Sequence, residues 1–318
     1  MNIAKRIQVV RKDNAEHSPP WVACTACTVP LDFTDGLPWA YFEGDDTTCS
    51  ECASVLDWPK AIERRLAERH DIHRFAAVGA ATTSFDIELE PGRSAEIDVG
   101  RFGVPEDAQI LGKGYAPITD WITPGWPAAW PLEDHGNTPE RWEHPRVFRL
   151  FGKPFTATST GPTTVQIEVT WVRRGDLVHG QLVDACHMLR VVDPARSVLA
   201  ANTAAEIAFG RLVRKFLEGL GVEARHAQRF SRRGYWEQLH VILPALVAAL
   251  GIPWLDESIL HRLETLRGQR NTAAHSSTLS AATDELPALL AAAVIGASYT
   301  HFAEERFDRH ASRAQPRA

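Results

Sequence analysis

The sequence lacks the features that mark exported proteins, membrane-spanning proteins and basic coats for nucleic acid. Residues 1–14 carry charges throughout and contain no long apolar core, so they do not resemble a secretory signal. The most apolar stretch, residues 286–299, is rich in alanine and too short to cross a bilayer. The formal net charge is −6, so the chain as a whole does not attract a polyanion. We therefore expect a cytoplasmic protein with no membrane partner.

Cysteine is scarce as well, and four of the five cysteines form two Cys-x-x-Cys pairs. Two such pairs are the usual way to present four thiolates tetrahedrally to zinc. The loop between the pairs, residues 28–48, has 21 residues, and the length of such a loop is easily varied. The alternatives are two disulfides, which a reducing compartment disfavours, and redox pairs, for which a thioredoxin-like strand–helix context is missing. We predict that Cys24, Cys27, Cys49 and Cys52 hold a structural Zn²⁺ ion and that Cys186 is a core residue.

The zinc-ribbon-like module is expected to span residues 1–79 and to end with a helix over residues 58–75. Trp39, Tyr41 and Phe42 lie between the two cysteine pairs, where a strand of the ribbon is expected. A small core beside the metal is the simpler use of these rings, and stacking on bases or on a partner is the alternative.

From residue 82 onward the apolar residues recur at every second position. Phe85, Ile87 and Leu89 alternate with acidic residues, a turn follows at 91–94, and a second alternating segment covers residues 165–171. Residues 177–189 are expected to be the strand that pairs with this segment. Residues 115–145 are rich in proline and tryptophan and form either a packed excursion or a binding loop. We predict an antiparallel β-sandwich or open barrel.

This middle domain, residues 80–194, is acidic, with 16 Asp and Glu against 10 Lys and Arg. A bare polyanion is not attracted to such a surface. We expect the domain to bind a regulatory protein or a small-ligand trigger, or to cover a basic face of the helical region.

Residues 196–318 carry 15 Lys and Arg against 12 Asp and Glu, and their apolar spacing predicts an all-α region. Helices are expected over residues 197–219, 235–250 with a bend at Pro244, 256–269 and 281–307. The connector after the first helix is rich in arginine and contains a phenylalanine. Such a segment can contact an RNA backbone and stack on a base. The alternative is a connector whose charged side chains are simply solvated. The candidate RNA-binding residues of the connector are Arg225, Arg229, Phe230, Arg232 and Arg233.

The third of these helices leads into Arg270, Asn271 and His275, three side chains that can transform a phosphodiester without a metal. Histidine exchanges a proton near neutral pH, arginine holds a phosphate through two parallel hydrogen bonds, and asparagine orients its neighbours. The alternative is structural, with Arg270 paired to Glu264 or Glu206 and His275 capping the end of the helix.

The string Arg270-Asn271-x-x-x-His275, at the end of an amphipathic helix in an all-α region, resembles the signature of HEPN domains (higher eukaryotes and prokaryotes nucleotide-binding). The resemblance covers about residues 197–309. It implies a helical bundle that dimerises so that two copies of the motif face each other. It also implies a metal-independent ribonuclease of the kind found in toxin and antiphage systems, or a binding or regulatory module that has lost catalysis.

Helix geometry leads independently to the same dimer. Five residues rotate a regular helix by about 500°, which leaves Arg270 and His275 roughly 140° apart. Asn271 and His275, four residues apart, share a face. One chain therefore does not easily bring both groups to one phosphate, whereas a two-fold dimer lets the arginine of one chain complement the histidine of the other.

The expected fold class is α+β multidomain: a zinc-ribbon-like module (1–79), a central antiparallel β-sandwich-like domain (80–194) and a HEPN-like helical bundle (195–318). We expect an endoribonuclease that cleaves RNA by attack of the 2′-hydroxyl at a homodimeric site, regulated by its zinc and β regions. The alternatives are a non-catalytic HEPN-like module that dimerises and binds nucleic acid or a partner, and a sensor whose zinc and β regions recognise a trigger.

Overall fold

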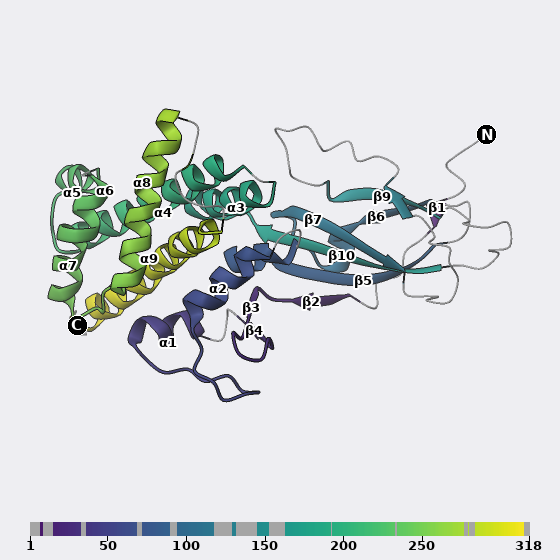
Figure 1. Ribbon diagram of the computed structural model, residues 1–318, viewed down its shortest axis with the longest axis horizontal. Helices are drawn as coiled ribbons and strands as arrows, with labels where there is room; N and C mark the ends of the chain where they lie inside the picture. The colour runs from purple at the N-terminus through teal and green to yellow at the C-terminus, as the bar shows by residue number, and fades with distance from the viewer. Residues whose placement is uncertain are drawn as a thin grey trace. The chain divides into compact units, whose positions relative to one another are not determined.

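The computed structural model describes residues 7–8, 15–32, 36–68, 72–89, 94–117, 129–131, 145–152, 163–191, 193–232, 234–276, 279 and 284–314. Its contacts divide the chain into two units, each built from two chain segments (Figure 1). The β unit consists of Met1–Pro20 and Gly79–Arg174, and the helical unit of Trp21–Val78 and Gly175–Ala318. This differs from the expected three-part division, because the cysteine module joins the helices and the expected boundary at residue 194 falls inside the helical unit.

Two four-stranded sheets make up the described part of the β unit. The first sheet, in the order β1-β6-β9-β8, contains β1 (Ile7–Gln8), β6 (Ser94–Asp98), β9 (Val147–Gly152) and β8 (Ala129–Pro131). The second, in the order β2-β5-β10-β7, contains β2 (Glu16–Ser18), β5 (Ala81–Leu89), β10 (Thr163–Arg173) and β7 (Ala108–Pro117). Strand pairs are antiparallel except β1 with β6, and a 3₁₀ helix, η3 (Val99–Phe102), follows β6.

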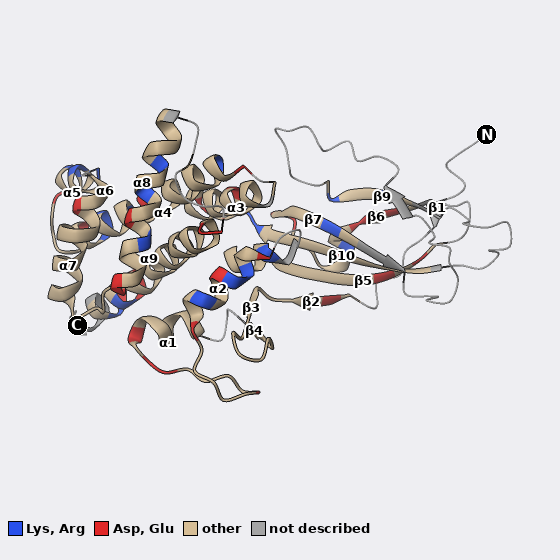
Figure 2. Ribbon diagram, in the orientation of Figure 1, with Lys and Arg blue, Asp and Glu red and all other residues tan. Residues whose placement is uncertain are grey.

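Side chains from both sheets meet in one apolar cluster, so the unit is a sandwich. Phe85 and Ile87 of β5 are buried and lie opposite Ile167 and Val165 of β10 in the register. The first sheet adds to the same cluster Ala95, Ile97, Phe148 and Leu150. Acidic residues occupy the intervening positions of β5 and β6 (Figure 2). The alternation predicted an antiparallel sandwich or open barrel, and the described strands form two mainly antiparallel sheets.

The predicted loop over residues 115–145 is described only at residues 115–117, 129–131 and 145. The first piece ends β7 and the second forms β8. The proline and tryptophan content predicted either a packed excursion or a binding loop. Most of the segment lies outside the described residues, so this prediction stays a prediction.

The strand predicted over residues 177–189 is wrong. These residues form helix α3 (Leu177–Arg190) of the helical unit, and β10 pairs with β5 and β7 instead. The side chain of Asp176 caps the helix by accepting a hydrogen bond from the backbone N–H of His179 at 3.1 Å. Leu182 and Cys186 are buried four residues apart, a helical spacing, and the predicted core position of Cys186 is confirmed.

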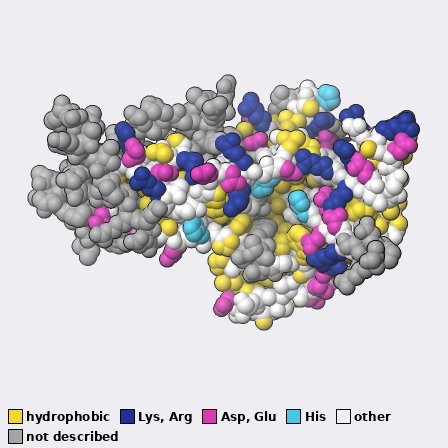
Figure 3. Space-filling view, turned by 180° about the vertical axis from the view of Figure 1, so that it is seen from behind, with side chains coloured by type: hydrophobic (Ala, Val, Ile, Leu, Met, Phe, Trp, Pro, Cys, Tyr) yellow, Lys and Arg dark blue, Asp and Glu magenta, His cyan; other side chains and the backbone are white. Residues whose placement is uncertain are grey.

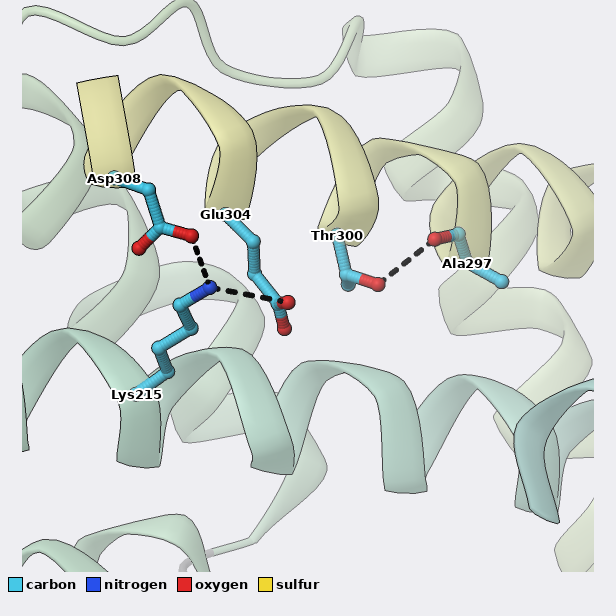
Figure 4. Close-up of polar contacts among 5 residues, drawn as sticks. All are labelled: Lys215, Ala297, Thr300, Glu304 and Asp308. Carbon is cyan, nitrogen blue, oxygen red and sulfur yellow. Dashed lines mark hydrogen bonds and ion pairs between the residues drawn. The ribbon is translucent and has the colours of Figure 1, made fainter. Parts of the chain in front are cut away.

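The helical unit is framed by two long helices, α4 (Pro194–Gly219) and α9 (Leu286–Ala314). The other helices of this region are α5 (Ala224–Ser231), α6 (Tyr235–Glu237), α7 (Leu243–Leu250) and α8 (Glu257–Ser276). Lys215 of α4 lies 3.4 Å from Glu304 and 2.8 Å from Asp308 of α9, and so bridges the two frame helices (Figure 4). The helices predicted here are present, but α8 continues as far as Ser276.

Helix α9 is longer than the apolar stretch considered in the sequence. Residues Leu286–His310 are long and apolar enough to cross a membrane, and 83% of their most apolar window is buried within the structure. Tyr299 and Phe302 are fully buried in this helix. Its apolar surface is therefore used in packing against the rest of the unit.

A π-helical turn, η4 (Gln238–Ile242), interrupts the helix predicted over residues 235–250. It ends just before Pro244, whose nitrogen has no proton to donate to the preceding turn. The bend predicted at this proline thus takes the form of a wider turn. Gln238 is buried there, and its Nε2 donates a hydrogen bond to the carbonyl of Ser231 at 2.9 Å, which ties the turn to the end of α5.

The cysteine module contains a small hairpin, two helices and a 3₁₀ helix. These elements are β3 (Trp21–Ala23), β4 (Pro30–Asp32), α1 (Leu37–Glu43), α2 (Trp58–Ala67) and η2 (Ile72–Val78). The helix predicted over residues 58–75 therefore ends eight residues early. The strand expected at the aromatic residues is wrong, since helix α1 begins there at Leu37, and Pro38 fixes a helical backbone angle in its first turn.

The aromatic residues of α1 pack against α9. The ring of Phe42 lies 5.4 Å from that of Tyr299 and 5.3 Å from that of Phe302. Trp39 donates a hydrogen bond from Nε1 to Glu305 at 2.8 Å. The tyrosine of the same set, Tyr41, donates to Asp256 ahead of α8. These rings form a core, as the simpler interpretation predicts, but it is shared with the helices and is not confined to the metal module.

Candidate functional site

The four paired cysteines form a compact cluster of free thiols. Their Sγ atoms all lie within 4.8 Å of one another, with 3.8 Å between Cys24 and Cys52 and 3.7 Å between Cys27 and Cys49. A disulfide requires an S–S distance of about 2.05 Å. Four thiolates about 2.3 Å from a central zinc ion stand roughly 3.8 Å apart at the corners of a tetrahedron. The cluster has the donor set and the spacing of a metal-binding site.

Both pairs are presented by the same backbone turn. In the first, the N–H of Cys24 donates to the carbonyl of Val29 at 2.9 Å, and Thr28 has a positive φ of 65°. In the second, the N–H of Cys49 donates to a carbonyl five residues later at 2.9 Å, and Ala53 has a φ of 54°. Residues other than glycine rarely adopt this left-handed conformation. The repeated strain indicates that the chain is shaped to hold the sulfur atoms.

The environment of the cluster lowers the pKa of Cys52 and Cys24 and raises that of Cys27. Hydrogen bonds from the side chain and the backbone of Ser54 lower the pKa of Cys52 to about 6. Hydrogen bonds from the backbone of Cys27 and Ala26 lower the pKa of Cys24. A backbone hydrogen bond from Val29 lowers the pKa of Cys27, but burial and hydrogen bonds with the other cysteines outweigh it and raise the value to about 12. Thiolates are the form of cysteine that binds a metal, so the two lowered pKa values fit the cluster to that role.

The predicted catalytic residues lie in the last two turns of α8. Arg270 is half-buried and continues the stripe of buried positions Leu263, Leu266 and Ala273. Its Nη1 donates a hydrogen bond to Oδ1 of Asn271 at 3.2 Å. Asn271 and His275 are exposed. Within the described residues Arg270 forms no ion pair, so its guanidinium is available to an anion.

The structural alternative for this arginine is not observed. Glu264, one of its two candidate partners, instead lies 2.7 Å from Nε2 of His240. The other, Glu206, forms no ion pair within the part of the chain that the structure describes. The exposed ring of His275 likewise makes no hydrogen bond to a described carbonyl, so the predicted cap is also not observed.

One face of α8 is exposed along its second half. On a regular helix, Glu264, Gly268, Asn271 and His275 lie within about 60° of one another. Arg270 lies on the adjacent side and reaches this face through its bond to Asn271. Asn271 and His275 therefore share one surface, whereas Arg270 lies roughly 100° and 140° from them around the helix.

A pocket of about 260 Å³ opens on this face. On the α8 side it is lined by Glu264, Arg267, Gly268 and Asn271. On the opposite side it is lined by Tyr235, Trp236, Leu239 and His240, from α6 and η4. Of the predicted site residues only Asn271 lines it, and His275 lies one turn further along α8. The sequence did contain a signal, because an exposed tryptophan next to a glycine and proline break is unusual on a packed helix.

The predicted RNA-binding segment forms α5 and its C-terminal end. Arg229 and Arg232 are exposed, and Phe230 keeps 43% of its surface exposed. Arg225 is exposed but lies 2.6 Å from Glu223, and Arg233 is outside the described residues. On the face shown in Figure 3, Lys and Arg side chains lie among acidic ones and do not form a single patch. These arginines can contact a phosphate, but the segment is not a continuous basic track.

Comparisons with known proteins give no match to a family model, to a curated protein or to a solved structure. The function of the site is therefore inferred from its own side chains.

Proposed function

We propose that this protein is a metal-independent endoribonuclease of the HEPN type, with Arg270, Asn271 and His275 as its reacting groups. The observation that supports it most is the arrangement at the end of α8: an arginine with no ion pair among the described residues, hydrogen-bonded to Asn271, beside an exposed histidine. An arginine without a carboxylate partner can hold a phosphate through two parallel hydrogen bonds.

The proposed reaction is a transesterification within RNA. His275 accepts the proton of a ribose 2′-hydroxyl, whose oxygen then bonds to the adjacent phosphorus. The bond from phosphorus to the 5′-oxygen breaks, and that oxygen takes a proton from an imidazolium or from water. Arg270 stabilises the charge that grows on the phosphoryl oxygens, and Asn271 holds the guanidinium in place. The products are a 2′,3′-cyclic phosphate and a 5′-hydroxyl.

The site is proposed to be completed by a second copy of the chain. Arg270 and His275 lie roughly 140° apart around a helix that stays regular through Ser276, so one chain offers them on different sides. In a homodimer formed through the helical unit, the arginine of each chain complements the histidine of the other. Activity is then expected to depend on protein concentration at dilutions that separate the copies.

We propose that the cysteine cluster holds Zn²⁺ as a structural ion. Cys24, Cys27, Cys49 and Cys52 supply four thiolates and fill a tetrahedral coordination sphere. When bound, the ion fixes the module that carries α1 and therefore the rings that pack on α9. This role is within the helical unit and differs from the expected one, in which zinc and β regions form a separate regulatory part.

Regulation through the β unit is also proposed, with a protein or small-ligand trigger and a toxin or antiphage role. A truncation at residue 193 does not test this. It separates α3 from α4, which are joined by a hydrogen bond from Ser197 Oγ to the carbonyl of Ala185 at 2.8 Å, and it removes the cysteine module from its unit. Regulation is therefore tested on the intact chain.

The decisive experiment is incubation of the purified protein with total RNA, followed by mapping of the ends produced. His275→Ala is expected to lower cleavage about 10²- to 10⁴-fold, as loss of a general base does. The matched control is His261→Ala, which removes another exposed histidine from the same helix. Cleavage must persist in a chelator while the zinc content of the same sample is unchanged. Parental cleavage by His275→Ala, or strict dependence on magnesium, contradicts the proposal.

The pocket supports a second candidate, a HEPN-like module that dimerises and binds RNA or a nucleotide without cleaving it. That function predicts intact RNA in every sample and binding that weakens in Arg270→Ala. The end-mapping experiment separates the two candidates, because only the nuclease leaves cyclic phosphate ends.

A further inference from the structure

We propose that the pocket between η4 and α8 binds one unstacked nucleobase, and that it prefers guanine. The inference rests on the proposed function for its link to RNA: the base would belong to a nucleotide next to the scissile phosphate. The pocket shares Asn271 with the proposed reacting groups, and Arg270 and His275 are not among its lining residues.

The size of the pocket limits its ligand. Drug-sized ligands occupy pockets of about 300–1,000 Å³, and this one has about 260 Å³. A single base fits a space of this order. The pocket also lies one helical turn, about 6 Å of rise, from His275, so the base and the reacting bond can belong to neighbouring positions of one strand.

An aromatic wall provides the stacking surface. Trp236 keeps 49% of its surface exposed although it lies in a packed bundle. Its ring is tilted by 30° from that of His240, with 5.1 Å between the ring centroids. Exposed indole rings of this kind stack on bases, and the interaction contributes about 1–3 kcal/mol for each base.

The polar groups of the pocket suit the edge of a base. The hydroxyl of Tyr235 is buried and has no hydrogen-bond partner within the described residues. A buried hydroxyl left without a partner is destabilising, and a base edge would satisfy it only by reaching an atom that solvent does not reach. Asn271 provides both a donor and acceptors at the other end. The lining also includes the guanidinium of Arg267, so these groups suit a base that carries its phosphate.

The carboxylate of Glu264 gives the preference for guanine. An ionised carboxylate only accepts hydrogen bonds, and one of its oxygens, Oε1, lies 2.7 Å from His240. Its other oxygen has no partner among the described side chains. Guanine presents two adjacent N–H donors on its Watson–Crick edge. Uracil presents one donor between two carbonyl oxygens, which the carboxylate repels.

The experiment measures the binding of GMP and UMP to the full chain by calorimetry. GMP is expected to bind at least ten times more tightly than UMP. Trp236→Ala should weaken GMP binding about 5- to 150-fold, the range for loss of one base stack, while Trp236→Phe keeps an aromatic ring and most of the affinity. Glu264→Gln should abolish the preference for GMP. The control is Val241→Ala, which truncates an exposed apolar side chain of η4 outside the pocket.

A second arm separates this inference from the nuclease. RNA oligonucleotides that differ by one G-to-U change are incubated with the parental protein, and cleavage beside the guanine is expected. Cleavage with no guanine preference, together with equal binding of GMP and UMP, overturns the base pocket and leaves the nuclease intact. Preference for GMP with no cleavage by any sample overturns the nuclease and supports the pocket as a site for a free nucleotide.

Discussion

The two units bury different kinds of polar side chain. In the described part of the β unit the buried polar residues are threonines: Thr82, Thr83 and Thr170. The helical unit buries amides, a histidine and guanidinium groups as well, among them Asn202, His187, Gln238, Arg65 and Arg74. A strand accommodates threonine at little cost, but buried amides and cations require a specific arrangement of partners. Both units have apolar cores, and the helical unit in addition holds buried amide, imidazole and guanidinium groups in fixed positions.

The variant with the largest expected effect on only one of the two units removes a ligand of the proposed metal site. Cys49→Ser is expected to abolish metal binding and with it much of the stability of the helical unit, since structural zinc binding contributes about 10–16 kcal/mol in small zinc-dependent folds. The β unit should keep its own unfolding transition. Metal content and thermal unfolding are the measurements. Cys186→Ala, in the core of α3, is the control and should retain the metal.

A metal content unchanged in Cys49→Ser would contradict the proposed site. Loss of both unfolding transitions together would contradict the expectation that the two units unfold separately, because the β unit would then depend on the cysteine module for its stability.

A smaller change separates stability from binding. The hydroxyl groups of Tyr235, in the helical unit, and Thr170, in the β unit, are both buried without a described partner. Tyr235→Phe and Thr170→Val should each raise the free energy of unfolding by about 1 kcal/mol, because each removes an unsatisfied polar group. Only the tyrosine variant should also weaken GMP binding, as calorimetry would show. Equal GMP affinity in the two variants would remove Tyr235 from the base pocket.

The smallest expected effect concerns the bridge between α4 and α9. Burial lowers the pKa of Lys215, but its bonds to Asp308 and Glu304 outweigh this, and the pKa is raised above 10.5. A raised pKa means that the bridge stabilises the protein fully below pH 10.5 and is lost as pH rises through the raised value. Lys215→Met should therefore lower the free energy of unfolding at pH 7 by about 0.5–1 kcal/mol, and less at higher pH.

The measurement is urea unfolding of the helical unit at both pH values. Arg214→Met is the control, since Arg214 pairs with Glu218 within α4 and joins no second helix. An equal loss in the two variants, or a loss that grows with pH, would show that the bridge does not hold the frame helices together.

Local patterns were sufficient for much of the fold. Spacing alone predicted the cysteine cluster, because Cys-x-x-Cys fixes which side chains one turn presents. Alternation predicted the sandwich, since Phe85 and Ile87 point to one face of a strand. The wrong strand over residues 177–189 had a correctable cause: Asp176 is a helix cap, and Leu182 and Cys186 are four residues apart. An apolar run of that length fits either structure unless its ends are considered.

The candidate site was only partly predictable. Arg270, Asn271 and His275 could be identified because they lie close together in the sequence. The pocket joins Trp236 to Glu264, which come together only when the turn before Pro244 packs on α8. The sharing of the aromatic core between α1 and α9 also depends on long-range packing. Periodicity describes one element at a time and does not specify which elements meet.

The chain passes between its two units after residues 20, 78 and 174. During synthesis the β unit is therefore complete once residue 174 has left the ribosome, whereas the cysteine module must wait for α9, the helix that covers Phe42 and Trp39. Because domains fold as they emerge, the nascent chain carries an early segment with the candidate metal site, and the contacts of Phe42 and Trp39 with α9 form only when translation reaches that helix. Binding of a metal ion at this stage would give the cysteine module a defined fold before helix α9 has been synthesised.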